Sequence, residues 1–179
     1  SFSGTAQTML VGTDGRLDRN ALDYVNSALK SQAVPVLYQA YQDSRITNQW
    51  DKASLANRVL NYVGQDQQAN LLLNDIVTNT NLDSRMRAGT IARLAGGDFG
   101  PFGSESPTDP QIIKQRLQVL EALRPGVTDE RVLRSIDRTA QNLNNLLEGK
   151  PIENQGGGGG RGRGGGQNRG QNGGQAVNQ

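Results

Sequence analysis

Residues 83–96 read DSRMRAGTIARLAG and residues 51–64 read DKASLANRVLNYVG, two segments of equal length at an offset of 32 positions. An Asp at the start, an Ala in the middle, a β-branched residue further on and a closing Gly coincide in both. Apolar residues at spacings of three and four predict one buried face of an α-helix, and Gly commonly follows the end of a helix. The sequence therefore predicts two copies of one helical unit.

The same helical spacing extends outward from these segments through most of the chain. Asp51 and Asp83 are predicted as helix N-caps, and Asp109 precedes Pro110 in the arrangement typical of a helix start. No segment alternates as a β-strand does, so the predicted fold is all-α. About seven helices are expected, near residues 17–29, 35–41, 51–63, 72–77, 83–95, 110–123 and 129–147.

Composition divides the chain into a helical domain with an extension at each end. Residues 156–179 contain 12 of the 23 glycines, and such a segment buries too little apolar surface to offset the entropy of ordering it. We expect an N-terminal arm over 1–13, a helical domain over 14–150 with an inserted loop at 98–108, and a disordered Gly-rich tail over 151–179. A chain that begins with Ser1 rather than Met is expected to be a processed product or a fragment.

Several classes of function are disfavoured by what the sequence lacks. The chain has no Cys and no His, which removes disulfides, thiolate or imidazole metal ligands and the usual bases for a serine nucleophile. Acidic residues at helix starts are the expected response to the helix dipole. We therefore expect no catalytic residues, no metal site, no cofactor and no small-molecule substrate. No apolar run approaches the roughly 20 residues of a membrane helix, so a soluble protein without membrane contact is expected.

Part of the chain resembles the HEAT-repeat family. Residues 34–40 look like the first helix of a HEAT unit, and residues 72–76 followed by 83–87 and 91–94 resemble a full unit, with its Asp-x-x-apolar-Arg opening of the second helix. Residues 109–120 are similar to another second helix. The resemblance implies an α-solenoid of stacked helix pairs over residues 34–147 and a surface that binds other proteins. It also implies that Arg87 braces neighbouring units together with Asp83.

Arginine outnumbers lysine 15 to 4, which favours planar contacts with carboxylate or phosphate groups. The Gly-spaced arginines of the tail resemble the RGG-type segments that bind RNA. Arg134 and Arg138 continue from Arg131 along one predicted helix face, on the side opposite to the apolar residues. The candidate nucleic-acid contacts are Arg85, Arg87, Arg131, Arg161, Arg163 and Arg169.

A second resemblance is to the coat proteins of rigid rod-shaped plant viruses. Residues 83–87 look like the Asp-x-Arg-x-Arg RNA-contact segment of that family, and Arg131-Val132 followed by residues 143–146 resembles its later RNA-facing helix. The sequence thus leaves two functions open. The first is a non-enzymatic helical-repeat scaffold that binds a protein partner or itself. The alternative is a self-assembling, RNA-binding coat or nucleocapsid subunit of a helical rod or filament.

Overall fold

The computed structural model describes residues 9–97 and 104–153, and these residues are helical, as the sequence predicts. Within them the β-type pairs are two isolated bridges, Val11 with Leu17 and Gly97 with Ser104. The helices are α2 (Arg19–Leu29), α3 (Ala33–Gln42), α4 (Gln49–Val59), α5 (Gln67–Thr78), α6 (Ser84–Ala92), α7 (Pro110–Leu123) and α8 (Glu130–Leu147). Short 3₁₀ turns follow α2, α4, α6 and α7 at Lys30–Gln32, Leu60–Tyr62, Arg93–Ala95 and Arg124–Gly126.

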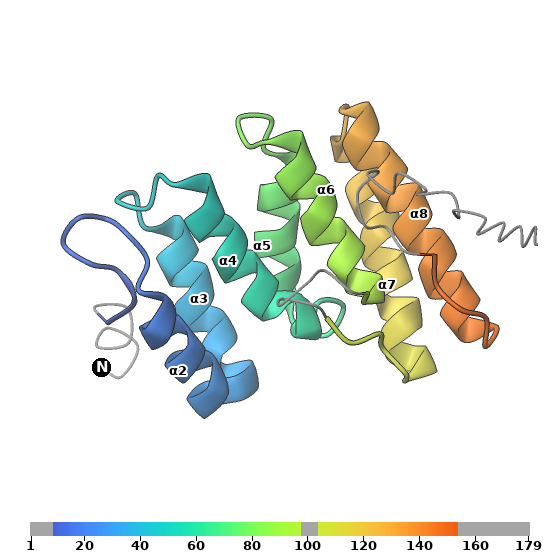
Figure 1. Cartoon of the computed structure of the whole chain (residues 1–179), viewed down its shortest axis with the longest axis horizontal. Coiled ribbons are helices and arrows are strands. Elements are labelled where there is room, and N and C mark those ends of the chain that lie inside the picture. The colour runs from blue at the N-terminus through green and yellow to red at the C-terminus, as the bar shows by residue number, and fades with distance from the viewer. Residues whose placement is uncertain (1–8, 98–103, 154–179) are drawn as a thin grey trace, which may run out of the picture.

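The helices lie in two layers. In one layer α5 contacts both α3 and α7, and in the other α6 contacts both α4 and α8. Contacts of α4 with α3 and α5, of α5 with α6 and of α7 with α8 join the layers. In the view of Figure 1, α6 and α8 lie in front of α5 and α7. The two segments with the shared sequence pattern form α4 and α6, which are neighbours in the same layer.

The core lies between the two layers and is almost entirely aliphatic. Fully buried side chains come from helices of both layers, so the two layers bury their apolar faces against each other. The contact between α6 and α8 is the most extensive of all the helix pairs. Small residues lie at this contact and let the two helices approach closely. The Ser135 hydroxyl of α8 donates to the Ala88 carbonyl of α6 at 2.7 Å. The largest fully buried side chains include Leu22, Leu37, Leu55, Leu72, Leu73, Ile91, Leu94 and Leu120.

Asp51 is not the N-cap that the sequence predicts. Asn48 caps α4 instead, since its side-chain oxygen accepts from the backbone N–H groups of Trp50 and Asp51 at 2.9 and 3.2 Å. The Asp51 side chain is 1% exposed, and its Oδ2 accepts from Arg16 Nε at 2.9 Å and from the Leu17 N–H at 3.2 Å. The aligned Asp83 does cap α6, so equivalent positions of the two segments have different structural roles.

The chain that precedes α2 packs on the core. Leu10 is fully buried and Val11 nearly so, although both fall within the expected N-terminal arm. A tight turn follows, in which Gly15 adopts φ +76° and would place a Cβ 2.4 Å from the Arg45 carbonyl oxygen. Only glycine fits there. This turn brings Arg16 to Asp51 and ties the N-terminal segment to α4.

None of the helices in the described part of the chain has both the length and the apolar composition that spanning a membrane requires.

Replacing Leu73 by Ala should lower the free energy of unfolding by about 2–5 kcal/mol, because the fully buried side chain leaves a cavity. Leu71 lies on the same helix but is 42% exposed, and the same replacement there should cost less than about 1 kcal/mol. Urea unfolding followed by circular dichroism measures both losses. Equal losses would contradict the orientation of α5.

Candidate arginine interface on α6 and α8

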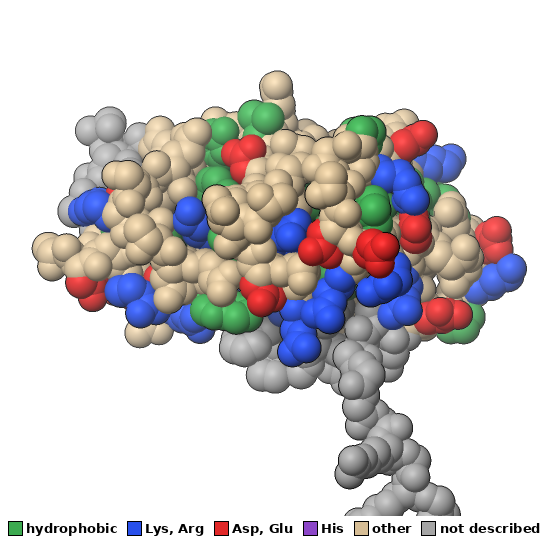
Figure 2. Space-filling view, turned by 90° about the horizontal axis from the view of Figure 1, so that it is seen from above, with side chains coloured by type: hydrophobic (Ala, Val, Ile, Leu, Met, Phe, Trp, Pro, Cys, Tyr) green, Lys and Arg blue, Asp and Glu red, His purple; other side chains and the backbone are tan. Residues whose placement is uncertain are grey.

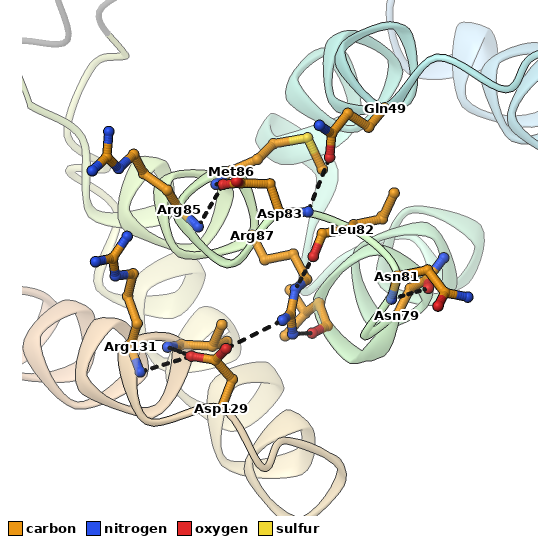
Figure 3. A network of polar contacts seen from close by, with 12 residues as sticks. Gln49, Asn79, Asn81, Leu82, Asp83, Arg85, Met86, Arg87, Asp129 and Arg131 are labelled. Carbon is orange, nitrogen blue, oxygen red and sulfur yellow. Dashed lines mark hydrogen bonds and ion pairs between the residues drawn. The ribbon is translucent and has the colours of Figure 1, made fainter.

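Arg87 is buried where α5, α6 and α8 meet. Its side chain is 4% exposed; Nε donates to the Leu82 carbonyl at 3.2 Å and Nη1 to the Val77 carbonyl at 3.1 Å. Nη2 lies 3.5 Å from Asp129 Oδ2 (Figure 3). One guanidinium thus joins the last turns of α5, the loop before α6 and the start of α8.

The expected pairing of Arg87 with Asp83 is wrong. The Asp83 carboxylate accepts from the backbone N–H groups of Arg85 and Met86, at 2.8 and 3.1 Å, and so caps α6. Its own N–H donates to Gln49 Oε1 at 2.9 Å, which links α6 to the start of α4 (Figure 3). Because α6 rotates by about 100° per residue, Arg87 points inward while Arg85 points outward. Burial leaves Arg87 without access to a large ligand, so we do not include it in a nucleic-acid interface.

Arg85 and Arg131 lie next to each other on the surface. Both are exposed, and Figure 3 shows their side chains extending toward the same side from α6 and α8. Each follows its helix cap in the same way: the Arg85 N–H donates to Asp83 and the Arg131 N–H to Asp129, both at 2.8 Å. Neither guanidinium forms a hydrogen bond or ion pair with another described residue.

Arg134 and Arg138 extend this surface along α8. Both are exposed, and their spacing from Arg131 places all three on one side of the helix. Neither has an ion-pair partner within residues 9–97 and 104–153. We call this set the α6–α8 arginine face; its members are Arg85, Arg131, Arg134 and Arg138.

Exposed arginines elsewhere on the molecule are mostly paired. Arg16 pairs with Asp51, and Arg45 contacts Asp43 at 2.7 Å. Arg124 pairs with Asp137, and hydrogen bonding to this guanidinium lowers the pKa of the Asp137 carboxyl. Outside the arginine face, Arg19 is the exposed arginine that has no such partner in the described part of the chain.

The arginine face is not uniformly basic. In Figure 2 several Lys and Arg side chains lie close together over the half of the molecule that carries α6 and α8, with acidic side chains among them. Glu130 is exposed beside Arg131, whereas the Asp83 and Asp129 carboxylates accept hydrogen bonds from helix N–H groups. The tail arginines of the candidate set, Arg161, Arg163 and Arg169, lie outside the described residues.

Two titratable groups with pKa values raised by burial lie on α3 and α5, in the other layer. Burial raises the pKa of Tyr41 to about 12, and the negative charge of Asp75 adds to this shift. Burial also raises the pKa of Asp75. The shift keeps the Tyr41 hydroxyl protonated near neutral pH, so this group does not act as a base there. Among the described residues no group of three or more acidic side chains could hold a metal ion.

The sequence analysis missed one polar residue that the structure makes prominent. Asn142 of α8 is 1% exposed, and its amide binds the backbone of Glu153 through two hydrogen bonds. The sequence carried no signal for it, because Asn142 lies four residues after Arg138, on the same side of the helix as the arginines, where an exposed amide is expected. Those partners come from a segment that the sequence analysis assigns to the tail.

Replacing Arg87 by Ala should lower the free energy of unfolding by about 2–5 kcal/mol, because two buried carbonyls and Asp129 lose their donor. Arg85→Ala removes the same charge from an exposed position two residues earlier, and it should change stability by less than about 0.5 kcal/mol. Chemical denaturation of both variants checks the difference. A loss for Arg87→Ala no larger than that for Arg85→Ala would refute the bracing role.

No protein-family model matches the chain, no curated protein matches it, and no solved structure matches it.

Proposed function

We propose that the chain is a non-enzymatic binding module, a HEAT-like stack of helix pairs that holds an anionic partner on its α6–α8 arginine face. The contacts between alternate helices support the stacked arrangement, as does the location of the repeated segments in α4 and α6. Units of this kind bury their apolar faces against their neighbours and leave one long side of each helix free for a partner.

The observation that carries the proposal is the group of four exposed guanidinia without acidic partners. Unpaired arginines in proximity repel one another, and an anion bound among them offsets this repulsion. Guanidinium groups bind phosphate oxygens in a bidentate way and stack on bases, whereas lysine acts as a point charge. Single-stranded nucleic acid, with evenly spaced phosphates, fits a row of arginines along one helix.

The surroundings of the arginine face favour nucleic acid over an acidic protein. Protein interfaces usually centre on buried aromatic or large apolar anchors. The exposed large apolar residues of the described chain lie mainly on other elements, and on α8 only Leu147, 36% exposed at its far end, belongs to this group. The side chains that follow the arginines along α8 are the amides Gln141 and Asn145, which bond each other at 3.0 Å.

A labelled oligouridylate should bind the full chain at about 50 mM salt and be released as salt rises. Combining Arg85→Ala with Arg131→Ala should weaken binding about tenfold, or about 1.4 kcal/mol, because two phosphate contacts are lost. The dependence of log affinity on log salt should become shallower by about 1.4. Fluorescence anisotropy measures both quantities.

Arg45→Ala with Arg124→Ala is the matched control, since it removes the same charge from arginines that already have acidic partners. It should change the affinity by less than about threefold. Equal losses in the two double variants would show that net charge alone attracts RNA. No binding by the full chain at low salt would exclude nucleic acid as the partner.

A second candidate, contact with a protein partner or with another copy of the chain, is favoured by two exposed aromatic side chains. Tyr24 of α2 is 67% exposed and Trp50 of α4 is 53% exposed. Aromatic residues are enriched at protein interfaces because each buries a large area at a low entropic cost. A scaffold of stacked helices could thus bind another protein chain through α2 and α4 and bind an anion through α6 and α8.

If these two aromatic side chains mediate self-association, sedimentation of the full chain should show a dimer or larger species that the combination of Tyr24→Ser and Trp50→Ser dissociates. Leu71→Ser, on the other layer, is the control and should leave the distribution unchanged. A monomer at all concentrations would rule out self-association.

A further inference from the structure

The helices α4, α6 and α8 begin in the same way. In each of them the side chain of the cap residue accepts a hydrogen bond from the backbone N–H of the second helical residue. The distance between nitrogen and oxygen is 2.9 Å in α4 and 2.8 Å in both α6 and α8. The second residues are Trp50, Arg85 and Arg131. The three helix starts are therefore locally equivalent.

The three helices also have the same orientation about their axes relative to the core. The second residue of each helix is exposed, whereas the third residue is buried. These buried third residues are Asp51, Met86 and Val132. Because successive residues of an α-helix are turned by about 100°, the second side chains leave the three helices on the same side. Figure 3 shows this for Arg85 and Arg131.

Two polar contacts hold the three helix starts next to one another. The Asp83 N–H donates to Gln49 Oε1 at 2.9 Å, which joins the starts of α4 and α6. Arg87 Nη2 lies 3.5 Å from Asp129 Oδ2, which joins the starts of α6 and α8 (Figure 3). In the view of Figure 1 all three helices begin at the upper edge of the molecule.

The second side chains thus form one row across the layer, in the order Trp50, Arg85 and Arg131. Packed helices lie about 8–10 Å apart, so the row is about 16–20 Å long. The cap side chains already bind the N–H groups of the second residues, so the side chains of the row are the groups that remain for a ligand. Trp50 is 53% exposed, and neither guanidinium of the row has a partner among the described residues.

We infer that Trp50 is a base-stacking residue of the nucleic-acid interface, so that one single strand lies along the row with phosphates on Arg85 and Arg131 and a base on the indole. The inference rests on the proposed nucleic-acid function and adds an aromatic contact from α4 to it. Proteins that bind single strands without sequence preference combine basic side chains for the backbone with aromatic side chains on which bases stack. Every base has a flat face, so the contact needs an unpaired base and no particular sequence.

Two strands with the same phosphates separate stacking from charge. A stacked strand advances about 3.4 Å per nucleotide, so a labelled oligouridylate of about eight nucleotides covers the row. An abasic strand of the same length is the second probe. At about 50 mM salt the unmodified chain should bind the oligouridylate about tenfold more tightly than the abasic strand, because only the former can stack on the indole.

Replacing Trp50 by Ala should reduce this preference to about twofold or less, whereas Trp50→Phe, which keeps an aromatic ring, should retain most of it. Tyr24→Ala is the matched control, since it removes an exposed aromatic side chain from α2, outside the row. It should leave the preference unchanged. Fluorescence anisotropy measures the affinities. Circular dichroism should show equal helix content in all variants, because the replaced side chains are exposed.

Intrinsic fluorescence gives an independent readout of the indole. The chain has one tryptophan, so the signal reports on Trp50 alone. Unlabelled oligouridylate should quench this fluorescence, whereas the abasic strand at saturation should leave it nearly unchanged. In the combination of Arg85→Ala with Arg131→Ala the quenching at saturation should persist, but it should require about tenfold more oligouridylate, because phosphate contacts are lost while the indole remains.

The outcomes distinguish a failure of the stacking role from a failure of the proposed function. Equal affinities of the unmodified chain for the two strands, or a preference that survives in Trp50→Ala, would overturn the stacking role and leave Trp50 to the protein contact considered above. Equal losses of the preference in Trp50→Phe and Trp50→Ala would also contradict it. If neither strand binds in a salt-dependent way, the proposed nucleic-acid function itself is wrong.

Discussion

Burying a guanidinium costs free energy unless its donors are used, and Arg87 uses them on three separate parts of the chain. The carbonyls of Val77 and Leu82 belong to the end of α5 and the following loop, and Asp129 belongs to the start of α8. This group braces α6 between α5 and α8, because its contacts lie on α5, on the loop before α6 and at the start of α8. A buried, multiply bonded arginine thus connects both layers at one edge.

This constraint also determines where the exposed arginines lie. With α6 fixed against α8 by Arg87 and by the bond from Ser135 to Ala88, the first turns of the two helices are held side by side. Arg85 and Arg131 therefore project from the same surface, with Asp83 and Asp129 occupied as helix caps. Two acidic residues that could neutralise the arginines are engaged elsewhere, which leaves the positive charge available to a partner.

The end of α8 fixes the course of the chain that follows it, as far as Glu153. A Schellman turn at Gly149 and the buried amide of Asn142 return the chain along α8, against the direction in which a simple extension would run.

The sequence by itself determined the helices. Apolar spacing and the cap residues Asp83 and Asp109 predicted helix type and position, since these are local properties that each segment carries alone. It could not assign Asn48 rather than Asp51 as the cap of α4, because Asp51 meets Arg16 only after the N-terminal segment has packed. Nor could it separate Arg85 from Arg87. Both are arginines on the same turn of α6, so the local sequence does not distinguish them. Only the tertiary structure decided that Arg87 is covered by α5 and α8 while Arg85 faces solvent.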